Sequence, residues 1–147
     1  MIRHKLYNAF TQINASEKRA IVEFLHKNLS GRTVSKCEIE EAVNYAVKER
    51  PSFGGFILTA NDADRILGTI LVNCTGMEGF NPKNRLVYLA IDKKRRRNGV
   101  AKKLLKEAIQ FTKGDLALQV EPGNTSIKLY EQLGFQTQYL EMRFANP

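Results

Sequence analysis

Cysteine and histidine are scarce in this chain of 147 residues, which has two of each. Cys37 and Cys74 stand alone, without the paired spacing of a metal site or a redox motif. We expect both to pack as small hydrophobic side chains in a reducing compartment. His4 and His26 have no acidic or cysteine partner at metal-ligand spacing. The sequence therefore predicts no metal site and no nucleophile paired with a histidine.

Long apolar runs are also missing. The longest strongly apolar run has six residues, Leu86 to Ile91, whereas a membrane-spanning helix needs about 20. No apolar stretch follows the basic N-terminal residues, so the sequence predicts no secretory signal. We therefore expect a cytoplasmic protein without a membrane partner. A composition with 43% hydrophobic and 26% charged residues predicts one globular domain over residues 1–147.

The net charge is +8, from 23 Lys and Arg against 15 Asp and Glu. Residues 93–113 contain nine basic side chains and a single acidic one, Glu107, and so hold the whole imbalance. The charges of the other segments cancel. This concentration predicts a local anion site rather than a generally basic protein.

Hydrophobic periodicity, capping residues and turn residues predict a mixed order of elements. Asn14 or Ser16 is expected to cap the first helix and Ser35 the second. The predicted helices cover 14–28, 35–50, 99–113 and 124–133. The predicted strands cover 2–10, 56–60, 65–74, 86–91 and 116–120, with one or two more over 135–144. This order predicts an α/β or α+β domain with a mixed sheet.

The basic segment joins an apolar strand to an amphipathic helix. Arg96 and Arg97 precede that helix and Lys102 lies in its first turn, where the helix dipole disfavours each cation by roughly a few tenths of a kcal/mol. Gly99 allows a close approach of backbone to an anion, and Ala101 keeps the next turn narrow. A polyanion held by backbone N–H groups and cationic side chains explains this placement.

Two other interpretations of the basic segment stay open. It can be a solvated charged face, or a nuclear-localisation or nucleic-acid patch, since Lys93 to Arg97 are five basic residues in a row. No aromatic residue occurs from Lys93 to Gln110, so stacking on bases is unsupported, although phosphate binding alone is not excluded. The pattern Gly-x-Gly-x-x-Gly is absent, which argues against a Rossmann dinucleotide site.

Two motifs occur in order around this helix. Arg96-Arg-Asn-Gly-Val-Ala101 fits Arg/Gln-x-x-Gly-x-Gly/Ala, and Leu118-Gln-Val-Glu-Pro-Gly-Asn124 is followed by Leu129-Tyr-Glu-Gln-Leu-Gly-Phe135. Together they resemble the GNAT superfamily of acetyl-CoA-dependent N-acetyltransferases, most strongly over 86–136. The resemblance implies a central mixed, mostly antiparallel sheet with about four helices, splayed between the strands at 86–91 and 116–120.

The resemblance also implies a coenzyme A site. The strand before the turn pairs with the pantetheine arm, the turn holds the pyrophosphate, a lysine can reach the 3′-phosphate, and an Asn contacts the cofactor arm. A tyrosine in the second motif is the acid for the leaving thiolate. The residues so implied are Leu89, Ala90, Ile91, Arg96, Arg97, Asn98, Gly99, Val100, Ala101, Lys102, Asn124 and Tyr130. Tyr130 can instead be a core aromatic, and Asn124 a plain helix cap.

The sequence departs from the family pattern at two positions. Arg97 stands where Gly is common in the family's pyrophosphate-binding motif, and Arg85 stands where some members carry a Glu base. Glu121 is our substitute candidate for the base, with an exposed loop carboxylate and a water relay as alternatives. Tyr88 is a candidate for lining the cleft.

The resemblance therefore predicts an N-acetyltransferase that uses acetyl-CoA and no metal. Direct attack by a primary amine in a ternary complex is expected, because no Cys or Ser nucleophile with a His partner is evident. The expected acceptor is a small molecule, and a protein N-terminus or lysine is the alternative. From other classes, a non-catalytic acyl-CoA-binding module or a nucleic-acid-binding module remains open, the latter disfavoured. We expect a monomer or homodimer.

Overall fold

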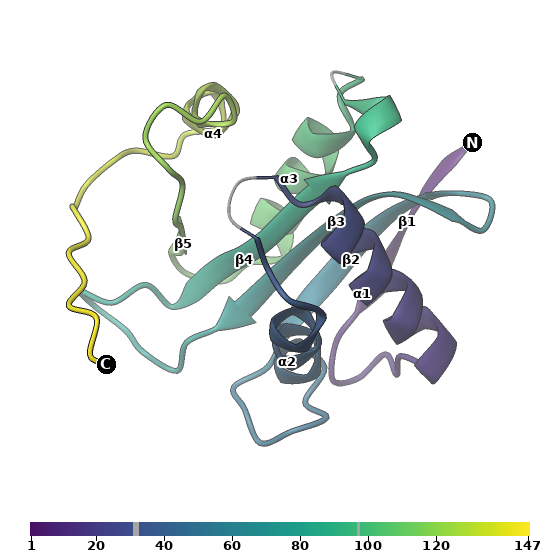
Figure 1. The fold of residues 1–147 in the computed structure, drawn as a ribbon, viewed down its shortest axis with the longest axis horizontal. Coiled ribbons are helices and arrows are strands. Elements are labelled where there is room, and N and C mark those ends of the chain that lie inside the picture. Colours follow the sequence, from purple (N-terminus) through teal and green to yellow (C-terminus); the bar gives the residue numbers. More distant parts are fainter. Residues whose placement is uncertain (31–32, 97) are drawn as a thin grey trace.

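Within residues 1–30, 33–96 and 98–147, which the computed structural model describes, five strands form one sheet in chain order (Figure 1). The first four pair antiparallel with their neighbours, whereas the fourth and fifth are parallel. This is the mixed, mostly antiparallel sheet predicted from the sequence. The strands are β1 (Ile2–Tyr7), β2 (Gly55–Asp62), β3 (Arg65–Cys74), β4 (Asn84–Ile91) and β5 (Leu116–Leu118).

The first two helices cover one face of the sheet. α1 (Ala15–Asn28) begins at a capping box, in which the Asn14 side chain accepts from the Glu17 amide and the Glu17 carboxylate accepts from the Asn14 amide. α2 (Lys36–Ala46) is capped by Ser35, whose hydroxyl accepts from the Glu38 amide at 3.1 Å. The cap at Asn14 settles the choice left open by the sequence.

The opposite face is covered by α3 (Val100–Phe111), so the sheet separates two apolar layers (Figure 1). Fully buried residues such as Leu25 and Val43 pack against Ile57 and Leu71 on the α1–α2 side. On the other side, Leu104 and the rest of the apolar stripe of α3 pack against the alternate residues of the same strands. Alternation along β2, β3 and β4 thus fills both layers. The alternation along β4 is interrupted where its register with β3 shifts between Leu71 and Val72, so that Val87 and Tyr88 both pack on the α1–α2 side.

β4 is followed by a short 3-10 helix, η1 (Lys93–Arg95), and β5 is followed by α4 (Ile127–Gln132). Both β5 and α4 are shorter than expected from the sequence. Leu129, Tyr130 and Leu133 of the α4 region pack half-buried against the α3 layer. α4 is thereby attached to the sheet from the side of α3.

Two expectations from the sequence are wrong. Residues 135–144 form no strand, because the segment makes side-chain contacts such as Gln119 with Glu141 and no backbone ladder with β5. Its apolar residues Leu140 and Met142 are exposed. Cys37 is also exposed, because it lies on the outer face of α2, rather than packing in the core.

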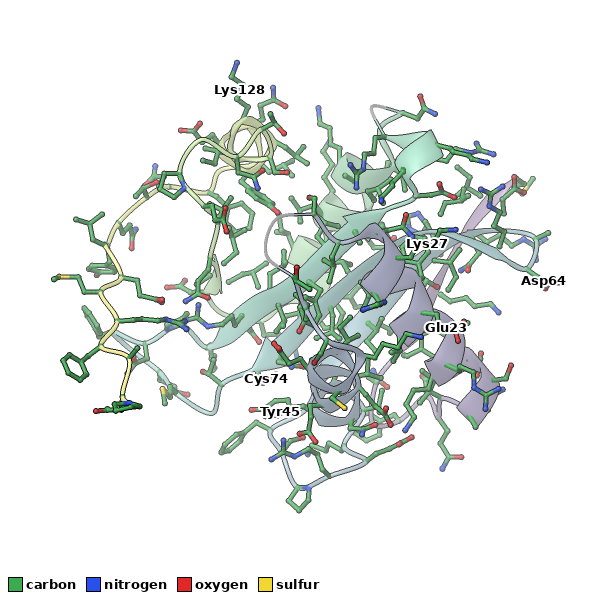
Figure 2. The ribbon with its side chains drawn as sticks, in the orientation of Figure 1. Glu23, Lys27, Tyr45, Asp64, Cys74 and Lys128 are labelled. Atoms are coloured by element: carbon green, nitrogen blue, oxygen red, sulfur yellow. The ribbon has the colours of Figure 1, made fainter. Side chains whose placement is uncertain are left out.

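The other cysteine is half-buried at the end of β3. Its carbonyl accepts from the Tyr45 hydroxyl at 2.6 Å, a contact that ties α2 to β3 (Figure 2). Its thiol lies 3.5 Å from Oδ1 of the buried Asn84 at the start of β4. Cys74 thus has the packing role expected of it.

Candidate functional site

β4 and β5 run together for only a short distance. Their register pairs Asn84 with Leu116 and ends at Leu86 with Leu118. β4 continues to Ile91, where it still pairs with Gly68 of β3, and the path of the chain after β5 diverges from it (Figure 1). Among the described residues, the β5-facing edge of β4 at Leu89–Ile91 has no strand partner. This splay lies between the two strands for which the family resemblance implied it, and it leaves backbone groups available to an extended ligand.

The open edge of β4 leads into a turn that starts helix α3. Gly99 is the N-cap of α3 and has φ 78°, a left-handed conformation that suits glycine. A Cβ placed on Gly99 would meet no atom within 4 Å. Within the described chain, no side chain caps the first turn of α3. The amides of Val100, Ala101 and Lys102 are therefore free of a side-chain cap, as an anion site at a helix N-terminus requires.

Asp92 closes the start of this turn. Its Oδ1 accepts from the Lys94 amide at 2.9 Å and its Oδ2 from the Arg65 guanidinium at 2.7 Å. These two bonds, the Lys94 amide first, hold the pKa of the Asp92 carboxyl below its usual range. The Asp92 amide donates to the Leu67 carbonyl at 2.8 Å, which fixes the turn to β3.

The basic side chains of the turn have different surroundings. Lys93 and Lys94 are exposed, and Arg95 lies 4.0 Å from Asp62 at the end of β2. Arg96 donates from Nη2 to the Asn28 carbonyl at 3.1 Å, so one of its donors is used inside the protein. Its planar fork retains further donors for an anion. Arg97, also expected here, lies outside the described residues.

Asn28 is a part of this site that sequence reasoning missed. It ends α1 and is only 5% exposed. Its Oδ1 accepts from the Lys93 amide at 3.3 Å, while its Nδ2 donates to the Phe24 carbonyl at 2.9 Å. Nothing in the sequence pattern links it to a residue 65 positions away.

Tyr130 of α4 is half-buried and packs against the apolar layer of α3. Lys128 of the same helix points outward (Figure 2). Burial raises the pKa of the Tyr130 hydroxyl, which therefore stays protonated at neutral pH. Within the described parts of the chain, the structure gives this hydroxyl no hydrogen-bond partner. It is thus both a partly buried aromatic and an available proton donor.

Tyr88 of β4, the candidate for lining the cleft, is buried in the apolar layer on the α1–α2 side. Two further candidates lie in the loop between β5 and α4. Glu121 is exposed, and its carbonyl accepts from the Asn124 amide at 3.1 Å. Asn124 Oδ1 accepts from the Ser126 amide at 2.8 Å, which closes the turn before α4. Asn124 therefore closes the turn ahead of α4, whose N-cap is Ser126, and its side-chain NH2 group remains for another partner.

These features suit a long ligand that carries both amides and phosphates. The open edge of β4 offers backbone donors and acceptors, and the uncapped start of α3 offers N–H groups next to cationic side chains. The open space at Gly99 leaves this start accessible. The donor set fits coenzyme A, whose pantetheine arm has amides and whose other end has phosphates.

Neither a metal nor a membrane is indicated by the described residues. They contain no group of three or more His, Cys, Asp or Glu side chains that could hold a metal ion. None of the helices that the structure describes is long and apolar enough to cross a membrane.

Comparison with known families identifies the class of protein. The family model described as "Acetyltransferase (GNAT) domain" matches residues 53–137, which is more than half of the chain. The chain therefore belongs to the GNAT acetyltransferase family. It is an acetyl-CoA-dependent N-acetyltransferase, as the two motifs predicted.

Solved structures share the fold over nearly the whole chain. A GNAT-family acetyltransferase from Streptococcus pneumoniae is similar with a TM-score of 0.72 and 18% identity, covering 99% of this chain and 98% of that one. The NatC complex bound to Gag peptide and CoA contains a chain with a TM-score of 0.71 and 22% identity, with coverages of 94% and 86%.

A third structure is an aminoglycoside 6′-N-acetyltransferase from Acinetobacter haemolyticus. It has a TM-score of 0.66 and 18% identity, with coverages of 100% and 98%. A search of curated protein sequences gave no match. At these identities the structures show the shared fold and leave the acceptor of this chain open.

Proposed function

We propose that this enzyme acetylates the primary amine of a small molecule by direct attack within a ternary complex. The observation that carries the proposal is the continuity between the open edge of β4 and the uncapped N-terminus of α3. A thioester bound along that edge has its reacting end near the splay and its phosphates near the basic turn. No covalent acetyl-enzyme is needed, because neither histidine is paired with a Cys or Ser nucleophile in the described residues.

The cofactor contacts follow from the elements. We assign the pantetheine amides to the backbone of Leu89, Ala90 and Ile91, and the pyrophosphate to the amides and side chains that begin α3. The side-chain amide of Asn124 is assigned to the cofactor arm. Arg97 is part of the same assignment from the family motif. The pyrophosphate-binding residues are Arg96, Arg97, Asn98, Gly99, Val100, Ala101 and Lys102.

Acetyl-CoA supplies an acetyl thioester, which a neutral amine can attack. Well under about 1% of a lysine-type amine is neutral at pH 7, whereas an α-amine with a pKa near 7.7–8.0 is easier to use. Glu121, or a water relay beside it, removes the proton from the amine. Tyr130 donates its proton to the leaving sulfur, a mild assistance, since burial keeps the hydroxyl protonated but also raises its pKa.

Two structural neighbours bear on whether the acceptor is a small molecule or a protein. Similarity to the aminoglycoside acetyltransferase extends over 100% of this chain and 98% of that one. This supports a small-molecule acceptor. The similarity to a chain of the NatC complex, which was bound to a peptide, makes protein N-termini the second candidate.

Release of the thiol from acetyl-CoA, measured against a panel of amines, tests the proposal. The panel contains amino acids, polyamines, aminoglycosides, peptides with a free N-terminus and peptides with an internal lysine. Small-molecule turnover well above that of both peptides supports the proposal. Turnover of the peptides alone would show that the acceptor is a protein amine and not a small molecule. Acetyl-CoA binding without turnover of any amine would favour an acyl-CoA-binding module instead.

Competition between nucleic acid and coenzyme A tests whether the protein is instead a nucleic-acid-binding module. If the basic turn serves coenzyme A, nucleic acid binds weakly at physiological salt, and any residual binding is displaced by coenzyme A. Tight binding of a duplex or single strand that coenzyme A fails to displace would favour a nucleic-acid module.

A further inference from the structure

The turn between β4 and α3 has little apolar packing of its own. We call its described residues, 92–96 and 98–99, the phosphate turn. Each residue of η1 is exposed or half-exposed, and Arg96, Asn98 and Gly99 are exposed. An exposed turn without an apolar anchor keeps its shape only through hydrogen bonds from neighbouring elements.

Those hydrogen bonds reach the turn from two sides. On the side of β3, the Asp92 side chain accepts from the Arg65 guanidinium and the Asp92 amide donates to the Leu67 carbonyl. Within the turn, the Asp92 side chain also accepts from the Lys94 amide. On the side of α1, a single residue supplies both bonds. The side-chain Oδ1 of Asn28 accepts from the Lys93 amide, and its backbone carbonyl accepts from the Arg96 guanidinium. The turn is therefore held between the end of α1 and the start of β3.

The chemistry of Asn28 suits this position closely. Its Nδ2 donates to the Phe24 carbonyl at 2.9 Å, which orients the amide so that Oδ1 faces the Lys93 N–H. Its own carbonyl is one of the last in α1, where an intrahelical donor is lacking and the helix dipole favours a cation. Arg96 supplies that cation at 3.1 Å.

We propose that Asn28 is a positioning residue for the acetyl-CoA site. It holds the backbone of the phosphate turn and one edge of the Arg96 guanidinium in the shape that receives the pyrophosphate. It makes no contact with the reacting atoms and acts through Lys93 and Arg96. The proposal rests on the assignment of the pyrophosphate to this turn under the proposed function.

The expected effect falls on cofactor binding. Without the Asn28 side chain, the Lys93 amide loses its acceptor, whereas the Asn28 backbone carbonyl that holds Arg96 remains. The backbone of the turn then samples more conformations in the free enzyme, and binding must bear the entropy of ordering it. The rate of acetyl transfer within the bound complex is unaffected, because the cofactor, once bound, orders the turn. A positioning role therefore raises the KM for acetyl-CoA and leaves kcat nearly constant.

The primary test compares Asn28→Ala with Asn14→Ala. Both remove an Asn side chain from an end of α1, but Asn14 caps the end of the helix away from the turn. We expect Asn28→Ala to raise the acetyl-CoA KM and the calorimetric Kd about fivefold to tenfold, with kcat within twofold of wild type. Asn14→Ala lowers the Tm and leaves KM and Kd at the wild-type values.

A second pair of variants leaves Asn28 in place. Lys93→Pro removes the N–H that Asn28 accepts, at the first position of η1, where proline is tolerated and the preceding Asp92 has a compatible ψ of 128°. Lys93→Ala removes the same charge but keeps the N–H. Lys93→Pro is expected to bind acetyl-CoA about fivefold more weakly than Lys93→Ala.

The outcomes separate this inference from the proposed function. Equal affinity of Asn28→Ala and wild type, or of the two Lys93 variants, overturns the positioning role while acetyl-CoA still binds. An equal rise of KM in Asn14→Ala assigns the effect to the stability of α1 and also overturns it. Absence of acetyl-CoA binding to the wild-type enzyme would instead reject the cofactor site itself. Should Asn28→Ala fail to fold, the Lys93 pair alone decides.

Discussion

Tyr130 and Phe135 lie edge to face at the end of α4, with ring centroids 5.7 Å apart and ring planes inclined by 66°. The Phe135 amide also donates to the Tyr130 carbonyl at 3.0 Å. The Gly134–Phe135 step of the second motif therefore fixes the ring of the candidate acid. The Tyr130 hydroxyl is partly buried, which raises its pKa and keeps it protonated. Within the described residues it has no hydrogen-bond partner that would compete for its proton.

Replacing Tyr130 with Phe should lower kcat and leave the KM for acetyl-CoA nearly unchanged. The ring and its contact with Phe135 are kept, so stability should stay close to wild type. We expect a loss of about tenfold in kcat, because a hydroxyl whose pKa is raised by burial gives only mild assistance to the leaving thiolate. Steady-state kinetics with a thiol-release assay measures both constants.

Tyr139→Phe is the matched control, since Tyr139 is an exposed tyrosine that packs against Phe80. Its turnover should equal that of wild type. If Tyr130→Phe also turns over at the wild-type rate, Tyr130 is a core aromatic and the proton comes from elsewhere.

Replacing Arg96 with Ala should weaken acetyl-CoA binding about tenfold and reduce the dependence of Kd on salt. The guanidinium supplies charge-assisted hydrogen bonds to phosphate, which contribute about 1.5–3 kcal/mol each before screening. Calorimetric titration at low and at physiological salt measures both effects. Arg50→Ala removes the same charge from the exposed Glu41 pair on α2 and should leave Kd unchanged. Wild-type affinity of Arg96→Ala at low salt would contradict the phosphate role.

The loss of stability on replacing Gly99 should come from its backbone angle and not from a steric clash of the new side chain. A Cβ at Gly99 meets no atom within 4 Å, but its φ of 78° costs a non-glycine residue about 1–2 kcal/mol. Gly99→Ala should therefore lower the free energy of unfolding by about 1 kcal/mol and weaken acetyl-CoA binding. Gly99→Asn should lose less, because Asn tolerates this conformation. Urea unfolding and calorimetry compare the two, and equal losses would argue against the backbone explanation.

The stability of the protein at acid pH should depend in part on Asp92, which holds the phosphate turn. Its pKa is lowered in the folded protein, first by the Lys94 amide and then by Arg65. The stabilisation it provides is complete above the pKa of the unfolded chain, near 3.9, and is lost as the pH falls through the lower pKa of the folded protein. Asp92→Asn should therefore flatten the fall of Tm between pH 5 and 2.5. An identical fall in both proteins would assign the acid loss to other carboxyl groups.

Much of the fold could be predicted from the sequence. The period of Val100, Leu104 and Ala108 defined α3, because that pattern matches its buried face. The continuous apolar run Leu86–Ile91 predicted β4, whose side chains pack into both apolar layers. Residues 135–144 show why the same reasoning failed at the end of the chain. An apolar pattern records a preference for burial, whereas a strand also needs a neighbouring edge with which to pair, and the sequence does not reveal where that edge lies.

The candidate site was predictable where its residues are adjacent in the chain. The charge concentrated around Gly99 predicted an anion site at the start of α3. The residues that shape the turn came from distant elements, with Asn28 at the end of α1 and Arg65 at the start of β3. No local pattern marks such contacts, since they depend on how α1 packs across the sheet.

Amide NMR during a titration with coenzyme A tests the central claim most directly. The account predicts that the largest shifts fall on the first turn of α3, at Gly99, Val100 and Ala101, and on Leu89 to Ile91 of β4. The amides of α2 and of β1 should move little. Shifts that cluster elsewhere, or none at saturating coenzyme A, would contradict the claim that the open edge of β4 and the uncapped start of α3 form the cofactor site.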